Sequence, residues 1–188
     1  MITENSNVIQ KYKYVDFESG NTSIINPYIV PNVAAIARQM TSSSQIMLIV
    51  KRTLSLNPLN IIRFGLNNLP FAVSILKMNF AAGVKVLCEL EILKQLEKEK
   101  TNHFVFHYQM VDMALAFGNK SVLLNFFYLS KKYGFVPGLI SNNPERMLSF
   151  LSGFSKLPEG LMVYTPLRLI SDNVRKVMDG SGVHFVGI

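Results

Sequence analysis

Two lysines follow short apolar runs, where a parallel sheet would place a nucleophile. Lys77 comes after residues 71–76, and Lys51 comes after residues 46–50. A lysine that is desolvated at the end of a strand has a lowered pKa, and its neutral amine can attack a carbonyl carbon to form a Schiff base. Lys77 is therefore a candidate catalytic residue, and Lys51 and Arg52 are candidates for binding an anionic substrate. The alternative is that each lysine extends to solvent from the rim of the sheet.

Two histidines, His103 and His107, have the i, i+4 spacing that would suit zinc on a helix, with Asp112 as a further ligand. Residues 103–108 are rich in β-formers, however. On a strand the two imidazoles lie ~13 Å apart, which is too far to share one metal ion. We therefore predict no metal site. His107 then stands near the carboxyl end of a strand, as a general acid or base or as a hydrogen-bonded structural residue.

Polar residues also follow later apolar runs. Asn142 and Asn143 stand directly before Pro144. Asn and Pro are typical of a helix start, so one asparagine should cap a helix while the other is free to hydrogen-bond a substrate. Thr165 ends the next apolar run and offers a hydroxyl to the same rim, and Arg168 is a candidate partner for an anion. Ordinary loop chemistry would explain each of these residues as well.

The elements that would position these side chains are clearest in the C-terminal third. Residues 135–141 lead into a helix start at 142–145, residues 160–166 lead into another at 171–172, and a third apolar run covers 183–188. Strand, helix, strand, helix, strand is the pattern of a parallel sheet. Ligands of such sheets bind at the carboxyl ends of the strands, which is where the candidate residues fall.

The same alternation is predicted upstream, with strands at 46–50, 71–77 and 103–108 and helices at 33–40, 57–68 and 84–100, while residues 111–133 form one helix or two. Six or seven parallel strands are too few for a complete barrel, which needs ~200–250 residues. We therefore predict an α/β fold built as a reduced or incomplete TIM-like barrel, with an open doubly wound sheet as the alternative. No glycine-rich dinucleotide or phosphate loop is present, so no cofactor is predicted.

One stretch resembles a known group of proteins. Residues 131–148, with the sequence KKYGFVPGLISNNPERML, and residues 160–166, with the sequence GLMVYTP, are similar to the late strands of aldolase-type TIM-barrel proteins. The resemblance covers about a third of the chain and favours the barrel. It implies a site at the strand carboxyl ends and carries no catalytic residue across.

The composition predicts a single α/β domain over residues 22–188, preceded by an N-terminal arm over residues 1–21 that could form an edge strand. The chain is 49% hydrophobic and has a mean hydropathy of +0.25. A sheet covered on both faces, or an apolar surface buried in a homo-oligomer, would explain this, and we expect a homo-oligomer. No apolar run is long enough to span a membrane, and the single Cys88 suits a reducing compartment, so we expect a cytoplasmic protein.

The net charge of +7 favours a small anionic metabolite as a partner. The 19 Lys and Arg residues are scattered, so binding of nucleic acid is not expected. Two functions remain open. The first is a lyase or isomerase that acts on a small anionic or phosphorylated carbonyl compound, with Lys77 and His107 as the working residues. The second is a non-catalytic binding or assembly protein of the same fold.

Overall fold

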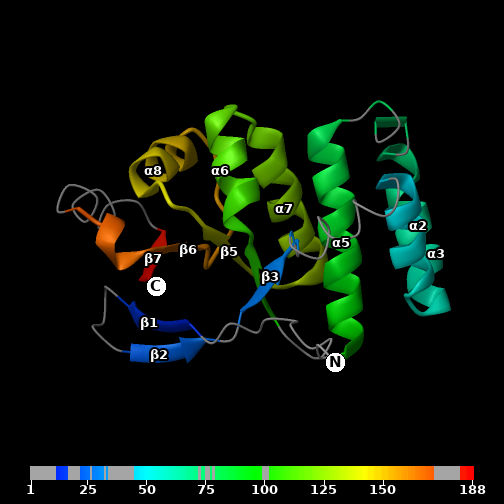
Figure 1. The fold of residues 1–188 in the computed structure, drawn as a ribbon, viewed down its shortest axis with the longest axis horizontal. Helices are drawn as coiled ribbons and strands as arrows, with labels where there is room; N and C mark the ends of the chain where they lie inside the picture. Colours follow the sequence, from blue (N-terminus) through cyan, green and yellow to red (C-terminus); the bar gives the residue numbers. More distant parts are fainter. Residues whose placement is uncertain are drawn as a thin grey trace, which may run out of the picture.

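The fold is described by a computed structural model over residues 12–16, 22–25, 27–31, 33, 45–71, 73–74, 77, 79–98, 102–171 and 183–188. Its centre is a sheet of seven strands (Figure 1). Five of them are mutually parallel and lie side by side in chain order: β3 (Tyr28–Val30), β4 (His103–Phe106), β5 (Val136–Ile140), β6 (Met162–Thr165) and β7 (His184–Gly187). The predicted α/β class with parallel strands is therefore confirmed. The sheet is open and is not closed into a barrel.

Two N-terminal strands extend the sheet beyond β7. The strands β1 (Tyr12–Asp16) and β2 (Thr22–Ile25) form an antiparallel pair, and β1 also pairs antiparallel with β7. The strand predicted within residues 1–21 is therefore present as β1, but it lies inside the sheet, and the edge strand is β2. The helix predicted over residues 33–40 lies outside the described residues except for residue 33.

Helices follow the parallel strands along the chain. They are α5 (Phe80–Lys98), α6 (Tyr108–Ala116), α7 (Lys120–Tyr133) and α8 (Pro144–Ser152). Parallel strands that are added in chain order by crossovers of one hand carry their helices on one face of the sheet. Figure 1 shows α6, α7 and α8 above the sheet, with α5 beside α7. Alternation of side chains along the strands fits this: Phe104, Phe106 and Leu139 belong to the helix-facing core, whereas Val105 and Ile140 belong to a separate cluster on the other face. One-sided packing is the arrangement of a barrel segment.

Two predicted strands are wrong. Residues 46–50 belong to the helix α2 (Gln45–Leu54), and residues 71–77 begin in the 3-10 turn η1 (Leu69–Phe71) and continue through helical residues 73 and 74 to a turn at Lys77. A short apolar run fits a strand and a helix equally well. The exposed apolar side chains of α2, at Met47, Val50 and Leu54, have the i, i+3, i+7 spacing of a helix.

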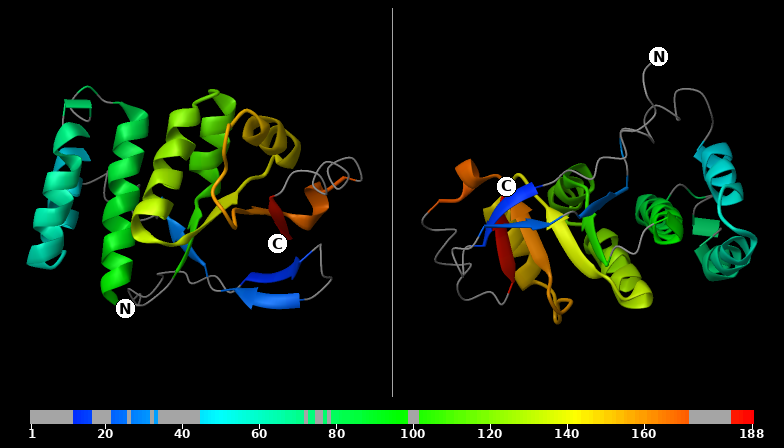
Figure 2. Two further views of the ribbon diagram at one scale, coloured as in Figure 1. Left: turned by 180° about the vertical axis from the view of Figure 1, so that it is seen from behind. Right: turned by 90° about the horizontal axis from the view of Figure 1, so that it is seen from below.

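Local helix signals were more reliable. The helix α3 (Pro58–Asn68) begins where Asn57 accepts a hydrogen bond from the Asn60 amide. The segment 111–133 divides into α6 and α7 at Gly118, whose φ of +62° suits glycine. Two further helices, α2 and α3, form a layer on the far side of α5, as the rear view in Figure 2 shows. No helix among the described residues is long and apolar enough to cross a membrane.

Candidate functional site

The predicted rim residues are divided between two parts of the molecule. His107 directly follows β4, Asn142 follows β5 and Thr165 ends β6, so these three lie at the carboxyl ends of adjacent strands. Arg168 is exposed in the 3-10 turn η2 (Leu167–Leu169) just beyond β6. Asn143 caps α8 by accepting a hydrogen bond from the Arg146 amide, as predicted for one of the two asparagines.

The remaining predicted residues lie away from the strand ends, because the strands assigned to them are helical. Lys51 is exposed on α2, and Lys77 is exposed in the turn before α5. Arg52 faces α5, where its Nη1 lies 2.5 Å from Glu91 Oε1. The structure therefore does not bring Lys77 and His107 together at a strand rim.

A carboxylate that the sequence did not place at the rim is Asp112, on α6. Ser141 Oγ donates to Asp112 Oδ1 at 2.8 Å, and the Asn142 amide lies 3.4 Å from Oδ2. Thr165 is fully buried on the neighbouring strand, and its Oγ1 has no hydrogen-bond partner among the described residues. The sequence suggested Asp112 only as a zinc ligand beside the two histidines. Its position at the rim was not predicted, because it lies inside α6 and depends on how that helix packs.

The imidazole of His107 accepts a hydrogen bond within its own helix start. Its Nδ1 accepts a hydrogen bond from the Gln109 amide at 3.2 Å and so caps α6. Burial lowers the pKa of His107 and so favours the neutral imidazole, and the contact with the Gln109 amide requires the tautomer in which Nδ1 accepts. His107 therefore fits the hydrogen-bonded structural alternative.

The second histidine, His103, lies on the sheet face opposite the helices. Its Nε2 is 2.5 Å from the hydroxyl of Tyr164, and both residues are buried. The Tyr164 ring crosses the sheet over Gly138, where a Cβ would stand 2.8 Å from the ring carbon Cε2. Burial lowers the pKa of His103 to about 4, so the imidazole is neutral at physiological pH.

The buried His103 should make stability depend on pH. An unfolded chain binds a proton at this residue below its ordinary pKa of 6.5, whereas the folded chain binds it only below about 4. Stability contributed by the neutral imidazole is therefore lost progressively as pH falls from about 6.5 to about 4. We expect NMR titration to give this low pKa and a His103→Gln variant to show a weaker loss of stability over the same range. Titration of His103 near 6.5 would contradict the assignment.

A cavity of about 360 Å³ opens between α5, α7 and the segment that precedes α5. We call it the α5–α7 cavity. Its lining consists of three asparagines, two serines, two alanines and one aromatic residue: Phe71, Ser74, Asn79, Ala81, Ala82, Asn119, Ser121 and Asn125. The helices α5 and α7 run parallel. Ala81, near the start of α5, contacts Asn125 in the first half of α7, and Glu89, further along α5, contacts Lys132 near the end of α7. The cavity thus lies at the N-terminal ends of both helices.

Two of the asparagines that line the cavity already make hydrogen bonds within the protein. Asn79 Oδ1 accepts a hydrogen bond from the Ala82 amide at the start of α5, and Asn125 Nδ2 donates to the Ala81 carbonyl at 3.0 Å. Asn119 differs, since it precedes α7 without making a capping hydrogen bond. Its carboxamide and the hydroxyls of Ser74 and Ser121 give the cavity a polar wall of donors and acceptors.

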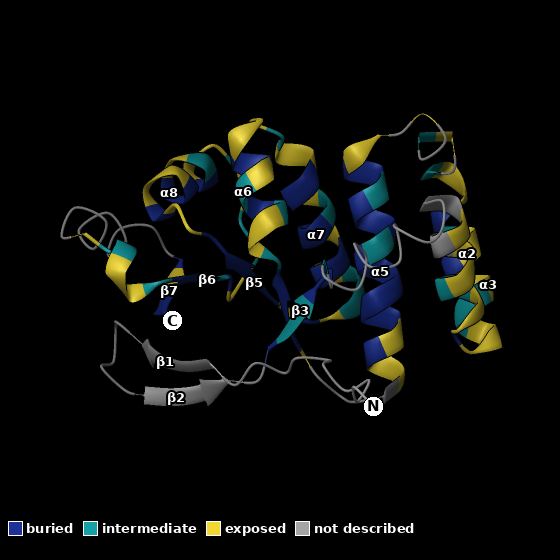
Figure 3. Cartoon of the chain, in the orientation of Figure 1, coloured by how far each residue is buried: buried dark blue, intermediate teal, exposed yellow. Residues whose placement is uncertain are grey.

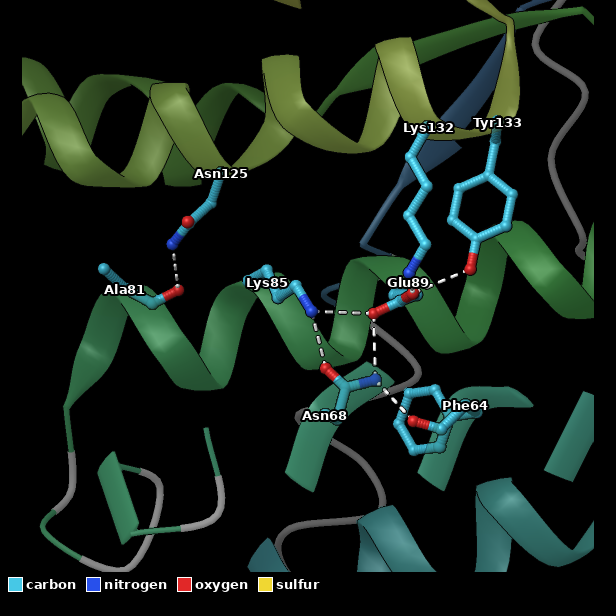
Figure 4. Close-up of polar contacts among 8 residues, drawn as sticks. All are labelled: Phe64, Asn68, Ala81, Lys85, Glu89, Asn125, Lys132 and Tyr133. Carbon is cyan, nitrogen blue, oxygen red and sulfur yellow. Dashed lines mark hydrogen bonds and ion pairs between the residues drawn. The ribbon is translucent and has the colours of Figure 1, made fainter. Parts of the chain in front are cut away.

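A buried ionic cluster lies deeper between the same helices (Figure 4). Lys85, 2% exposed, and Glu89, 0% exposed, are one turn apart on α5, with Lys85 Nζ 2.9 Å from Glu89 Oε2. The α3 residue Asn68 bonds to both side chains. From α7, Lys132 Nζ and the Tyr133 hydroxyl reach Glu89 Oε1, at 2.5 Å and 2.7 Å. The cluster therefore joins α3, α5 and α7.

The pKa values in the cluster reflect burial and pairing. Burial alone would raise the pKa of Glu89, but hydrogen bonds from Lys132, Tyr133, Lys85 and Asn68 outweigh it and hold the pKa below its usual value. Burial lowers the pKa of Lys85, and its contacts with Glu89 oppose that shift. Lys85 Nζ also lies 4.3 Å from the centroid of the Phe71 ring, which lines the α5–α7 cavity. Phe71 thus contacts the buried ammonium and also borders the cavity.

Comparison of the chain with protein-family models, curated proteins and solved structures found no match. The resemblance to aldolase-type barrels therefore stays a prediction. Two places remain as candidate sites on geometry alone. At the strand rim, Ser141, Asn142 and Asn143 are tied into hydrogen bonds, whereas Thr165 Oγ1 has no partner among the described residues. The α5–α7 cavity combines open volume with polar side chains.

Proposed function

We propose that the chain is a binding protein for a small anionic ligand, such as a phosphate-bearing metabolite, and that the ligand occupies the α5–α7 cavity. The observation that carries the proposal is the polar wall of the cavity, formed by Ser74, Asn119 and Ser121. A concave site with a few convergent polar groups is the usual form of a small-molecule site. Amide and hydroxyl groups can donate hydrogen bonds to phosphate oxygens.

The charge around the cavity favours an anion. Neither α5 nor α7 has an acidic residue in its first turn. The partial positive charges at the N-terminal ends of two long parallel helices therefore face the cavity without a competing carboxylate from those turns. Behind Phe71, the ionic cluster holds two lysines, Lys85 and Lys132, against the single carboxylate of Glu89. The net charge of +7 adds a general attraction for anions.

The lining favours binding over catalysis. Its polar members are Ser and Asn, which do not titrate near neutral pH. The nearest buried amine, Lys85, is held as an ion pair with Glu89, and so it is poorly suited to nucleophilic attack on a carbonyl group. This corresponds to the non-catalytic alternative predicted from the sequence, with a small anion as its ligand.

Inorganic phosphate is the probe for this site. We expect saturable binding in calorimetry, with a Kd of about 1 mM or tighter, against chloride at equal ionic strength. Ser121→Glu should weaken binding by about tenfold or more, because it puts a carboxylate at the cavity. A glutamate in the first turn of α7 suits the helix dipole, so this variant should fold normally.

The matched control is Ser149→Glu, which makes the same charge change on an exposed residue of α8 away from the cavity. It should bind phosphate as the wild type does. Equal binding by wild type and Ser121→Glu would contradict the proposal, as would no binding at all. Borohydride trapping of a phosphorylated aldehyde on Lys77 would also contradict it, since that result would restore the lyase hypothesis.

A further inference from the structure

The layer formed by α2 and α3 has an unusually apolar outer surface. Six side chains on the two helices have the i, i+3, i+7 spacing of a helical stripe, and two more continue the surface beyond α3. These eight residues, which we call the outer apolar face, are between 45% and 79% exposed: Met47, Val50, Leu54, Leu59, Ile62, Leu66, Leu69 and Val73.

The opposite side of the same two helices is fixed to α5. Phe64 packs with Leu90 in a buried cluster, and Asn68 enters the ionic cluster around Glu89. Arg52 on α2 pairs with Glu91 on α5. The inner side of the layer is therefore occupied, and the outer apolar face points away from α5 into solvent, where Figure 3 shows α3 largely exposed.

The area of this face matches what one half of a stable dimer requires. A fully exposed aliphatic side chain presents roughly 60–120 Å² of apolar surface by its transfer free energy, so eight residues at these exposures present roughly 300–600 Å². An interface of standard size buries about 800 Å² on each partner, of which about 65% is apolar in homodimers. That is about 520 Å² of apolar surface, of which the outer apolar face can supply more than half and, at the upper end of its range, all.

The shape of the layer also suits a second copy. The apolar stripes of α2 and α3 have the same length, because residues 47–54 and residues 59–66 each span roughly 11 Å of helix. Two such layers can pack face to face about a twofold axis and form a group of four helices. The same surface of each copy then contacts the other copy. We infer that the outer apolar face is the interface of a homodimer. This inference is independent of the anion site.

The charges on the layer give the dimer a distinctive salt dependence. Neither α2 nor α3 contains an acidic residue, and Lys51 is exposed beside the apolar stripe of α2. Two copies meeting at this face bring like charges together, so added salt should strengthen association by screening them. Docking of an acidic partner would show the opposite dependence.

Sedimentation velocity of the full chain tests the inference. We expect the wild type to be a dimer at about 100 µM protein, with a Kd that falls as NaCl rises from about 50 mM to about 500 mM. The variant Ile62→Lys with Leu66→Lys should raise the dimer Kd by about 100-fold or more, because it places four lysines in the interface. The control variant Leu124→Lys with Leu167→Lys changes two exposed leucines outside the layer and should dimerise as the wild type does.

Three results would overturn the homodimer: a monomeric wild type at both salt concentrations, an Ile62→Lys, Leu66→Lys variant that dimerises as tightly as the wild type, or association that weakens as salt rises. Circular dichroism establishes that the variants are folded. Phosphate titration of the monomeric variant separates the two proposals, since the anion site should survive loss of the dimer. Loss of phosphate binding in the Ser121→Glu variant should likewise leave the dimer intact.

Discussion

Glu89→Gln is expected to lower the free energy of unfolding by about 3–5 kcal/mol, the largest effect of any single substitution considered for this chain. The glutamine keeps the shape of the side chain but removes its charge. Lys85 and Lys132 would then lie beside each other around a neutral amide, and Lys85 is almost fully buried. A buried charge that has lost its partner is strongly destabilising. Urea unfolding followed by circular dichroism measures the change.

A second substitution tests whether the loss comes from the unpaired ammonium. Adding Lys85→Met to Glu89→Gln removes the deeper cation while keeping a side chain of similar length. The double variant should recover part of the lost stability, because a buried ion pair replaced by apolar groups is often nearly neutral. A loss below about 1 kcal/mol for Glu89→Gln alone, or no recovery in the double variant, would contradict the cluster's role in joining the helices.

Gly138→Ala should lower the free energy of unfolding by about 1–3 kcal/mol through overpacking. Gly138 lies inside β5, and a Cβ there would stand 2.8 Å from both the Tyr164 ring and Val105 Cγ2. Neither neighbour can move easily, because both belong to the buried cluster on that face of the sheet. Thermal unfolding of the variant measures the loss.

The matched control for Gly138 is Gly65→Ala on α3. A Cβ at Gly65 meets no atom within 4 Å, and alanine is the better helix former, so this variant should be stabilised by up to about 1 kcal/mol. Opposite signs for the two glycines are the expected result. Equal effects would mean that the close approach of Tyr164 to the sheet does not constrain residue 138.

Signals that depend on a few neighbouring residues could be predicted from the sequence. The Asn57 and Asn143 caps and the Gly134 helix end, with a φ of +67°, follow from the local chemistry of helix termini. The α/β class with a parallel sheet could also be predicted, because apolar runs alternate with capped helices. The residues around 46–50 and 71–77 were misassigned because their apolar runs are too short to distinguish a helix from a strand.

The candidate site was much less predictable, because its parts are far apart in the sequence. Lys85 and Glu89 have the i, i+4 spacing of an ordinary surface ion pair, and only the packing of α3 and α7 buries them. Asn119 and Ser121 resemble a common loop and helix start, and only the parallel packing of α5 and α7 makes them line a cavity with Ser74. The lysines expected to be desolvated, Lys77 and Lys51, are both exposed, and the buried lysine is Lys85, which the sequence did not single out.

The most direct test of anion binding in the α5–α7 cavity is a residue-resolved NMR titration of the full chain with inorganic phosphate at constant ionic strength. The account predicts that the backbone amides of Ala81, Ala82, Ser121 and Val122 shift together, saturably and with one Kd, while those of the strand rim at Asn142 and Arg168 do not. Saturable shifts confined to the strand rim, or uniform weak shifts over the basic surface, would contradict it.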